Sequence, residues 1–259
     1  MEKFTDRIAK SSKKKRSKII LALDLDPSTS NLLDKGLNIL SQASQSICAV
    51  KINRHMLLPL GLLGGVKRLV DYAHRLDLPA IMDCKLNDIG STNRVMAEWF
   101  FRAGFDALTV SPYVGWEQGL EPVFQLAKEQ GKGLLVLTYM SHKGAEQTFE
   151  KALLAGYGKP KPAYKVFARW ALKWKADGAI VGATRPEKIV EVKRILKGEV
   201  PIYSPGVGVQ GGSLEEAVKS GADYLIIGRS ILRAENPGEA AETLRERAWK
   251  AAGSRGRAT

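Results

Sequence analysis

The sequence contains few cysteines, few histidines and no long apolar segment. Its 259 residues include only two cysteines, Cys48 and Cys84, which excludes a small domain held together by several disulfides. Both lie in apolar runs typical of buried strands, so we expect free thiols in a reducing, cytoplasmic compartment. The three histidines, His55, His74 and His142, do not show the spacing of a metal site. No run approaches the ~20 apolar residues of a membrane span, and the first residues lack the apolar core of a secretory signal.

Positive charge is abundant but concentrated at two ends of the chain. The sequence has 40 Lys and Arg against 27 Asp and Glu, a net charge of +13. Residues 1–18 contribute +6 and residues 245–259 contribute +4, so the rest of the chain carries only +3. Basic segments can contact nucleic acid by neutralising phosphates, but no aromatic residue that could stack on a base interrupts Lys10–Lys18. We therefore favour residues 1–17 as a disordered or loosely packed extension and residues 253–259 as a solvated basic tail.

Eight short runs of apolar and β-branched residues recur from residue 19 onward, separated by amphipathic segments. These candidate strands are Ile19–Leu25, Ile47–Ile52, Ala80–Lys85, Ala107–Val110, Gly133–Thr138, Ala179–Val181, Ile202–Ser204 and Tyr224–Ile227. Their nearly continuous apolar character is typical of strands covered on both faces, as in a parallel sheet wrapped by helices. Eight strand–helix units in this length favour a single-domain (β/α)₈ TIM barrel over residues 18–252, rather than an open doubly wound sheet.

Helical periodicity fills six of the intervals between these runs. The predicted helices are Val66–Arg75, Thr92–Ala103, Glu117–Glu129, Val166–Ala176, Pro186–Leu196 and Leu214–Ser220. The segment Gly144–Ala163 contains several Gly and Pro residues, and we interpret it as a mobile loop between the fifth strand and its helix.

Charged residues stand where three successive apolar runs end. The first run ends near Asp24, the second at Lys51, and the third at Asp83 and Lys85, with Asp88 just beyond it. Because Asp83 and Lys85 are two residues apart, we expect their side chains on the same face of the strand. The C-terminal ends of the strands form the active face of a barrel of this kind. Acids and amines that alternate there keep each other charged, so the pattern predicts a protonated amine held in a fixed electric field.

Glycines and an arginine follow the last two runs. The segment after the seventh run contains Gly206, Gly208 and Gly211, and the eighth run ends at Gly228 and Arg229. Glycine lets backbone N–H groups turn toward an anion, and arginine offers paired donors, so we predict a phosphate site after strands seven and eight. The three glycines also match G-x-G-x-x-G, a dinucleotide fingerprint. We do not favour that interpretation, because the motif lies in the seventh unit and no acid ends the next strand to bind a ribose.

The order of these motifs resembles the orotidine 5′-phosphate decarboxylase family, especially its short archaeal form. The most specific element is D-x-K-x-x-D-I-x-x-T, which begins at Asp83 and ends at Thr92. The other matching segments are Leu23-Asp24, Val50-Lys51-Ile52, Thr138–His142, Pro205–Gly212 and Gly228–Ser230. The resemblance implies a barrel that converts orotidine 5′-monophosphate to UMP in pyrimidine biosynthesis, with no cofactor and no metal.

The resemblance also implies roles for individual residues. Asp24 and Lys51 would bind the ribose hydroxyls. Asp83 would lie beside the substrate carboxylate, and Lys85 would donate the proton to C6 of the pyrimidine. Asp88 would complete the active site of the second subunit in a homodimer.

Further positions would surround the base and the phosphate. Ile89 and Thr92 would lie beside Asp88, which predicts an apolar dimer interface near the helix that follows. Ser141 would hydrogen-bond the amide edge of the pyrimidine, and Gln210 would link the base region to the phosphate from a closing loop. The remaining substrate-binding positions are Pro205, Gly206, Gly228 and Arg229, the last two at the phosphate.

Three alternative functions are compatible with parts of the sequence. A metal-dependent sugar-phosphate decarboxylase or aldolase of the same suprafamily shares the D-x-K-x-x-D element, but it has an acid at the end of strand two, where this chain has Lys51. A Schiff-base aldolase would use Lys85 as its nucleophile, which requires a lowered pKa, and a neighbouring carboxylate such as Asp83 acts in the opposite direction. A nucleic-acid-binding protein would contact its partner through the basic ends of the chain. We do not favour nucleic acid as a partner.

Overall fold

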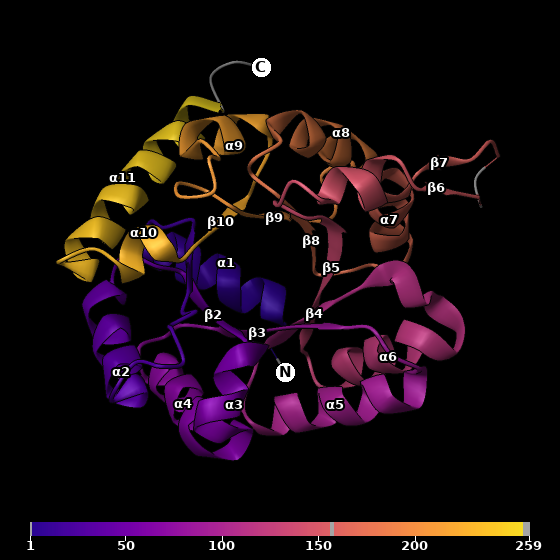
Figure 1. The fold of residues 1–259 in the computed structure, drawn as a ribbon. Coiled ribbons are helices and arrows are strands. Elements are labelled where there is room, and N and C mark those ends of the chain that lie inside the picture. The colour runs from indigo at the N-terminus through magenta and orange to yellow at the C-terminus, as the bar shows by residue number, and fades with distance from the viewer. Residues whose placement is uncertain (1, 156–157, 256–259) are drawn as a thin grey trace.

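A closed barrel of eight parallel strands forms the centre of the molecule. The computed structural model describes residues 2–155 and 158–255. The strands are β1 (Ile19–Ala22), β2 (Ala49–Asn53), β3 (Ala80–Leu86), β4 (Ala107–Val110), β5 (Gly133–Tyr139), β8 (Gly178–Val181), β9 (Ile202–Pro205) and β10 (Tyr224–Ile227). They pair in the order β1-β10-β9-β8-β5-β4-β3-β2 and close on themselves, with helices around the outside (Figure 1). Each predicted run overlaps one strand, so the predicted (β/α)₈ barrel is confirmed.

The barrel strands are buried on both faces. Every residue of β1, β4, β5, β8 and β10 is buried. One face packs into the barrel interior and the other against the helical layer, so neither face needs polar side chains. This double burial explains why the sequence shows continuous apolar runs in place of alternation.

Helices cover the outside of the barrel. They are α2 (Leu32–Ala43), α3 (Leu57–Leu60), α4 (Lys67–Arg75), α5 (Gly90–Arg102), α6 (Glu121–Glu129), α7 (Ala163–Lys173), α8 (Pro186–Leu196), α9 (Leu214–Ser220), α10 (Arg229–Leu232) and α11 (Pro237–Arg255). The helix predicted from Glu117 begins later, at Glu121, because Gln118 has a left-handed backbone with φ of 54°. Within residues 2–155 and 158–255, none of the helices combines the length and the apolar character needed to span a bilayer.

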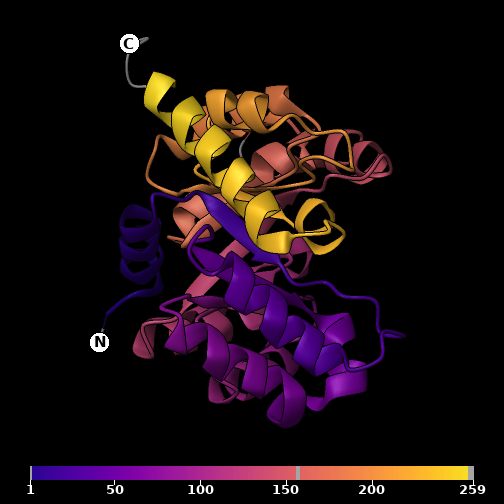
Figure 2. The same ribbon diagram turned by 90° about the vertical axis from the view of Figure 1, so that its left-hand side faces the viewer.

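The N-terminal extension is helical from Phe4 to Lys15 and packed, so the prediction of a disordered or loosely packed segment over residues 1–17 was wrong for residues 2–17; residue 1 lies outside the described part. Helix α1 (Phe4–Lys15) lies across one end of the barrel (Figure 2). Phe4 and Ile8 are 0% and 1% exposed. The ring of Phe4 occupies the space that a side chain at Gly133, the first residue of β5, would need. The buried Lys15 ammonium donates to the carbonyl oxygens of Ser44 and Leu76, at 2.7 and 2.8 Å. Apolar anchors and one buried amine therefore fix a segment whose composition suggested a solvated tail.

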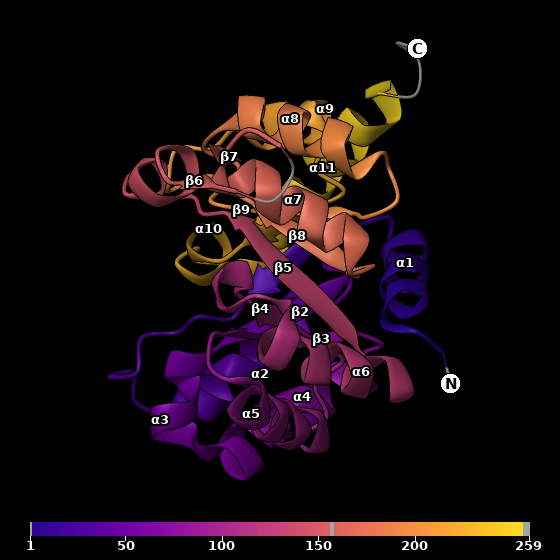
Figure 3. The same cartoon turned by 90° about the vertical axis from the view of Figure 1, so that its right-hand side faces the viewer.

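Two other segments differ from the expected loop and tail. Within Gly144–Ala163, a helical turn at Glu146–Glu150 precedes a small hairpin, in which β6 (Leu153–Leu154) pairs antiparallel with β7 (Lys161–Pro162). Residues 156–157 of this segment lie outside the described part. Figure 3 shows this hairpin at the opposite end of the molecule from α1. Helix α11 continues to Arg255, so the predicted tail over residues 253–259 starts too early; residues 256–259 lie outside the described part.

Candidate active site

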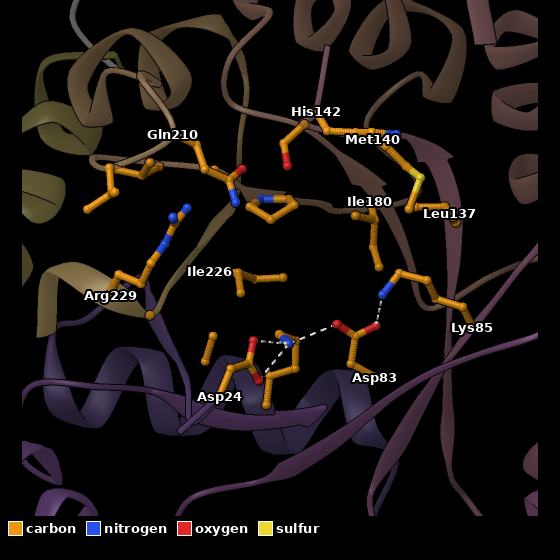
Figure 4. A pocket seen from close by; sticks show the side chains of 18 of the residues that line it. Asp24, Asp83, Lys85, Leu137, Met140, His142, Ile180, Gln210, Ile226 and Arg229 are labelled. Carbon is orange, nitrogen blue, oxygen red and sulfur yellow. Dashed lines mark hydrogen bonds and ion pairs between the residues drawn. The ribbon is translucent and has the colours of Figure 1, made fainter. Parts of the chain in front are cut away.

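A cavity of about 550 Å³ opens at the C-terminal ends of the strands (Figure 4). Side chains from β1, β2, β3, β5, β8, β9 and β10, and from the segments that follow them, contribute to its walls. The lining includes most of the predicted site residues, namely Asp24, Lys51, Asp83, Lys85, Ser141, Pro205, Gly206, Gln210, Gly228 and Arg229. Residues that are up to 205 positions apart in the sequence thus meet in one space, because parallel strands bring their C-terminal ends to the same rim.

Four charged side chains form a row along one wall, in which acids and amines alternate. The Lys51 ammonium lies between two carboxylates, 3.2 Å from Asp24 and 2.8 Å from Asp83. The Lys85 ammonium contacts the other oxygen of Asp83 at 2.6 Å. We call Asp24, Lys51, Asp83 and Lys85 the charge row; its ion pairs are drawn in Figure 4. Each charge has an opposite neighbour, which offsets the cost of removing these groups from water.

Burial and charge act in opposite directions on the groups at the centre of the row. Burial alone would raise the pKa of the Asp83 carboxyl, but the ammonium groups of Lys51 and Lys85 hold that pKa well below its ordinary value. Burial alone would lower the pKa of Lys51, but Asp83 and Asp24 raise it above its ordinary value. Asp83 and Lys51 therefore both stay charged at neutral pH. Lys85, whose side chain is 28% exposed, faces the cavity at the end of the row.

The backbone at Lys85 is unusual. Lys85 has φ of 48°, in the left-handed region that non-glycine residues rarely adopt. The pairing of β3 with β4 shifts between Met82 and Leu86, so Lys85 lies in an irregular part of the ladder. Its N–H donates to the hydroxyl of Thr109 on β4, at 2.8 Å. A polar side chain therefore replaces the backbone acceptor that a regular ladder would supply.

Arg229 and the glycine-rich 206–212 segment form the opposite wall of the cavity. Arg229 and Gln210 point into the cavity from the side opposite Lys85 (Figure 4). Gly206 has φ of 95°, and a Cβ there would lie 2.8 Å from the Cβ of Ser141, so the chain needs glycine to approach this wall. Gly208 has φ of 78°, and its Cβ would lie 2.5 Å from the hydroxyl of Ser230. These turns leave the guanidinium of Arg229 facing the cavity, where it can bind an anion.

Three predicted residues lie outside the cavity of their own chain. Asp88 and Ile89 are exposed, and Thr92 is half-buried in the first turn of α5. The side chain of Asn93 is buried beneath this segment, donating to the backbone oxygens of Asp88 and Gly119. The segment therefore has a defined conformation in which Asp88 and Ile89 face away from the protein core.

Comparison with known proteins agrees with this geometry. Residues 17–244 match the model of the family described as orotidine 5′-phosphate decarboxylase / HUMPS. The chain belongs to this family. It is 34% identical to the orotidine 5′-phosphate decarboxylase of Methanosarcina barkeri over 230 residues, which cover 89% of this chain and 94% of that protein. The predicted resemblance is therefore confirmed.

Solved structures of the family have the same fold. The orotidine 5′-phosphate decarboxylase of Pyrococcus horikoshii is 31% identical, with a TM-score of 0.71 over 89% of this chain and 98% of that chain. The enzyme from Methanocaldococcus jannaschii, solved with the inhibitor BMP, is 27% identical, with a TM-score of 0.74 over 90% and 98% of the two chains. The region that matches the family model contains the whole charge row and Arg229, whereas α1 precedes it.

Sequence reasoning missed the apolar part of the site. The cavity is also lined by Leu137, Met140, Ile180 and Ile226. Leu137, Ile180 and Ile226 belong to the apolar runs that predict the core, and no local signal distinguishes a residue at the open mouth of a barrel from one beneath it. Met140 lies in the Thr138–His142 segment, in which only Ser141 was given a role. His142, for which no role was assigned, lines the cavity as well. Thr109 was also missed, because a threonine within an apolar run is ordinary in a strand.

Proposed function

We propose that this protein decarboxylates orotidine 5′-monophosphate to UMP, with no metal or organic cofactor. The observation that carries the proposal is the Asp83–Lys85 ion pair of 2.6 Å, which faces the same nucleotide-sized cavity as Arg229. The acid–amine pair at one wall can act on the substrate carboxylate and on the carbon that loses it. The guanidinium at the opposite wall can bind a phosphate. The names of the relatives in the family support the same reaction.

The charge row supplies the chemistry of the proposed reaction. Loss of CO₂ from C6 leaves an electron pair in an orbital in the plane of the pyrimidine ring, where the ring delocalises it poorly. The fixed ammonium of Lys85 stabilises that charge as it develops. The same group then transfers a proton to C6, which yields UMP and a neutral amine that regains its proton from water. Asp83 holds Lys85 in place for both steps.

The neighbouring members of the row bind and orient the sugar. Asp24 is the outermost acid, with its side chain 31% exposed, and its oxygens can accept hydrogen bonds from ribose hydroxyls. The Lys51 ammonium, only 6% exposed, fixes the positions of Asp24 and Asp83 relative to one another. Binding of the ribose is thereby coupled to the geometry of the reacting groups.

The opposite wall recognises the remainder of the nucleotide. Arg229 and the backbone at Gly228 bind the phosphate, and Ser141 bonds the amide edge of the base. Gln210, between them on the 206–212 segment, links the two. Pro205 and Gly206 contact the substrate from the end of β9. Phosphate binding distant from C6 contributes to catalysis by closing this segment over the cavity, so that remote binding energy lowers the barrier.

A metal-dependent sugar-phosphate decarboxylase or aldolase is not favoured. The Lys51 ammonium lies within 3.3 Å of carboxylate oxygens from both Asp24 and Asp83. It therefore occupies the position between two acids that a divalent cation would otherwise take. A Schiff-base mechanism is disfavoured in turn by the ion pair of Lys85 with Asp83, since an attacking lysine must be neutral.

The direct test is the ultraviolet absorbance of orotidylate after purified protein is added in the presence of EDTA. We expect the substrate spectrum to disappear and the UMP spectrum to form. Full turnover with EDTA supports both the reaction and its metal independence, whereas no turnover with or without added divalent ions would contradict the proposal. Activity that EDTA abolishes and metal restores would favour the metal-dependent alternative.

A homodimer with shared active sites belongs to the same proposal. Asp88, with Ile89 and Thr92 beside it, completes the site of a second subunit. Large apolar side chains near this segment support an interface: Ile89 is 65% exposed and Trp99, on the same helix α5, is 44% exposed. Exposed apolar groups of this kind are typical of contact surfaces between subunits.

Mixing inactive variants tests the shared site. A Lys85→Ala chain and an Asp88→Ala chain each lack one partner of every site in their homodimers, but a heterodimer contains one intact site. We expect mixing, after subunit exchange, to restore up to about a quarter of the wild-type activity. The matched control mixes Lys85→Ala with Asp83→Ala, two residues of the same site, and restores none. Equal activity in both mixtures would contradict a role of Asp88 across the interface.

The compartment and pathway follow from the same proposal. UMP formation assigns the protein to pyrimidine biosynthesis in the cytoplasm. The free thiols of Cys48 and Cys84 are buried, as is usual for a protein of a reducing compartment. Cell fractionation with an antibody against the chain tests the location.

A further inference from the structure

The strand that carries Asp83 and Lys85 bulges where it passes β4. Met82 pairs with Leu108, and the next regular pair is Leu86 with Val110. Three residues of β3, Asp83–Lys85, therefore stand opposite a single residue of β4, Thr109. A bulge re-aims side chains and interrupts the ladder, and bulges are common next to active sites. Thr109 is thus the one β4 residue that faces the proposed proton donor and its carboxylate partner.

The Thr109 hydroxyl bonds to both of these residues. It accepts the backbone N–H of Lys85 at 2.8 Å and lies 3.0 Å from Oδ1 of Asp83. Because an N–H can only donate, the single proton of the hydroxyl is left to point at Asp83. Thr109 is 0% exposed, so neither bond can be replaced by solvent without a change of structure.

These bonds hold Lys85 at both ends. The hydroxyl secures the backbone of Lys85 in its left-handed conformation, with φ of 48°. The same hydroxyl orients the Asp83 oxygen that receives the Lys85 ammonium at 2.6 Å. The second oxygen of Asp83 binds the Lys51 ammonium at 2.8 Å. A strained backbone is maintained only when its surroundings fix it, and here one buried side chain does so.

We propose that Thr109 is a positioning residue of the active site, whose hydroxyl holds the β3 bulge so that the Lys85 ammonium reaches C6 of the substrate. It does not touch the nucleotide. Its removal therefore lowers the rate of the chemical step and leaves nucleotide binding intact. The inference rests on the proposed decarboxylation, which wild-type turnover tests by itself.

Replacement of the hydroxyl by a methyl group isolates this role. For Thr109→Val, which keeps shape and volume, we expect kcat to fall about 10- to 100-fold, the effect of removing hydrogen bonds to a buried charged group. The dissociation constant of UMP should stay within about two-fold, because uniform binding is unaffected. Thr109→Ser keeps the hydroxyl and should retain kcat within about three-fold of wild type.

Thr138→Val is the matched control. Thr138 is also 0% exposed on a barrel strand, β5, but among the described residues its hydroxyl bonds only to the backbone oxygen of Val136, at 3.2 Å. We expect its kcat to equal that of wild type. The proposal is overturned if Thr109→Val turns over as fast as wild type, if it loses no more than Thr138→Val, or if Thr109→Ser loses as much as Thr109→Val.

If Thr109→Val does not fold, a second pair of variants tests the role of the hydroxyl. Thr109→Ser and Thr109→Cys differ by one atom, and the thiol is a much weaker donor and acceptor. A kcat at least about ten-fold higher for Ser than for Cys supports the proposal, and equal values overturn it. Absence of turnover in the wild-type protein would overturn the proposed function and this inference together, whereas normal wild-type turnover with an unimpaired Thr109→Val would overturn this inference alone.

Discussion

Each end of the barrel contains a buried aspartate that pairs with basic side chains. At the mouth, Asp83 lies between Lys51 and Lys85. At the opposite end, the Asp106 carboxylate, 1% exposed, pairs with Arg7 of α1 and with His74 of α4, 2.9 Å away. Both carboxyl groups are partly desolvated, yet their cationic partners keep the pKa of each below the ordinary value. A buried acid with cationic partners is therefore not, by itself, a sign of catalysis.

The two clusters differ in what lies next to their basic side chains. Asp106 also accepts the backbone N–H of Ala80 at 2.7 Å, so its bonds join α1, α4 and the first residue of β3. All its partners in the described part of the chain belong to the scaffold, and the cluster fastens α1 to the barrel. Lys85, in contrast, ends its row facing a cavity of about 550 Å³. Barrels generally place chemistry at the C-terminal rim and stability at the other, and the two aspartates follow that division.

Among changes that distinguish the two ends of the barrel, we expect Lys85→Ala to have the largest effect. Without the ammonium, neither the developing charge at C6 nor its protonation is supported, and we expect kcat to fall by at least about 10⁴-fold. Thermal stability should change little, because Asp83 keeps its pair with Lys51. The absorbance assay for orotidylate and a thermal melt measure the two quantities. Substantial residual turnover would show that the row is structural, like the cluster at Asp106.

The next largest effect concerns the far wall of the mouth. Arg229→Ala removes the guanidinium that binds phosphate, so we expect kcat/KM to fall about 10²- to 10³-fold. Steady-state kinetics over a range of substrate concentrations measure this loss. Arg229→Lys keeps the positive charge but lacks the paired donors, so we expect its kcat/KM to lie between those of wild type and Arg229→Ala. An unchanged kcat/KM in Arg229→Ala would separate Arg229 from the substrate and leave the phosphate site unassigned.

The mouth was easier to predict from the sequence than the opposite end. Charged residues such as Lys51 and Asp83 stand out at the ends of apolar strands, where a core position has no need of them, and parallel strands must bring them to one rim. The cluster at Asp106 joins α1, α4 and β3, and only tertiary packing brings those elements together. No spacing of residues in the sequence indicates such a contact.

Helix α1 and Thr109 show two further reasons for incomplete prediction. The lysine run over residues 10–18 dominated the interpretation of the N-terminus, although Phe4 and Ile8, four residues apart, are a weak sign of one buried helical face. Thr109 bonds to a bulge, and the bulge depends on the pairing of two strands, which composition does not reveal. Asp88 illustrates the limit of a single chain, since its proposed role lies in a second subunit.

A smaller effect, on stability and not on turnover, is expected at the far end. Asp106→Asn leaves Arg7 without its buried counter-charge and His74 without its carboxylate partner, and we expect the free energy of unfolding at pH 7 to fall by about 3 kcal/mol. The value of kcat per folded molecule should stay within about two-fold of wild type. Denaturant unfolding followed by circular dichroism, together with the absorbance assay, tests both. A large loss of kcat without a loss of stability would contradict the proposed division between the two ends.

The smallest effect is a change in how this stability difference depends on pH. The Asp106 pKa in the folded protein lies below its ordinary value of 3.8, because its contacts with His74, the backbone N–H of Ala80 and the charge of Arg7 outweigh burial. A carboxyl group with a lowered pKa contributes stability that is fully present above the unfolded value and is lost as pH falls through the folded value. Asp106→Asn has no such group, so the gap in unfolding free energy between wild type and variant should narrow as pH falls below about 4. Because Asp83 titrates in both proteins, its contribution cancels in the difference. A gap that stays constant down to pH 3 would mean that the Asp106 carboxyl gains nothing from its partners, and the cluster at that end would then have to hold α1 by packing alone.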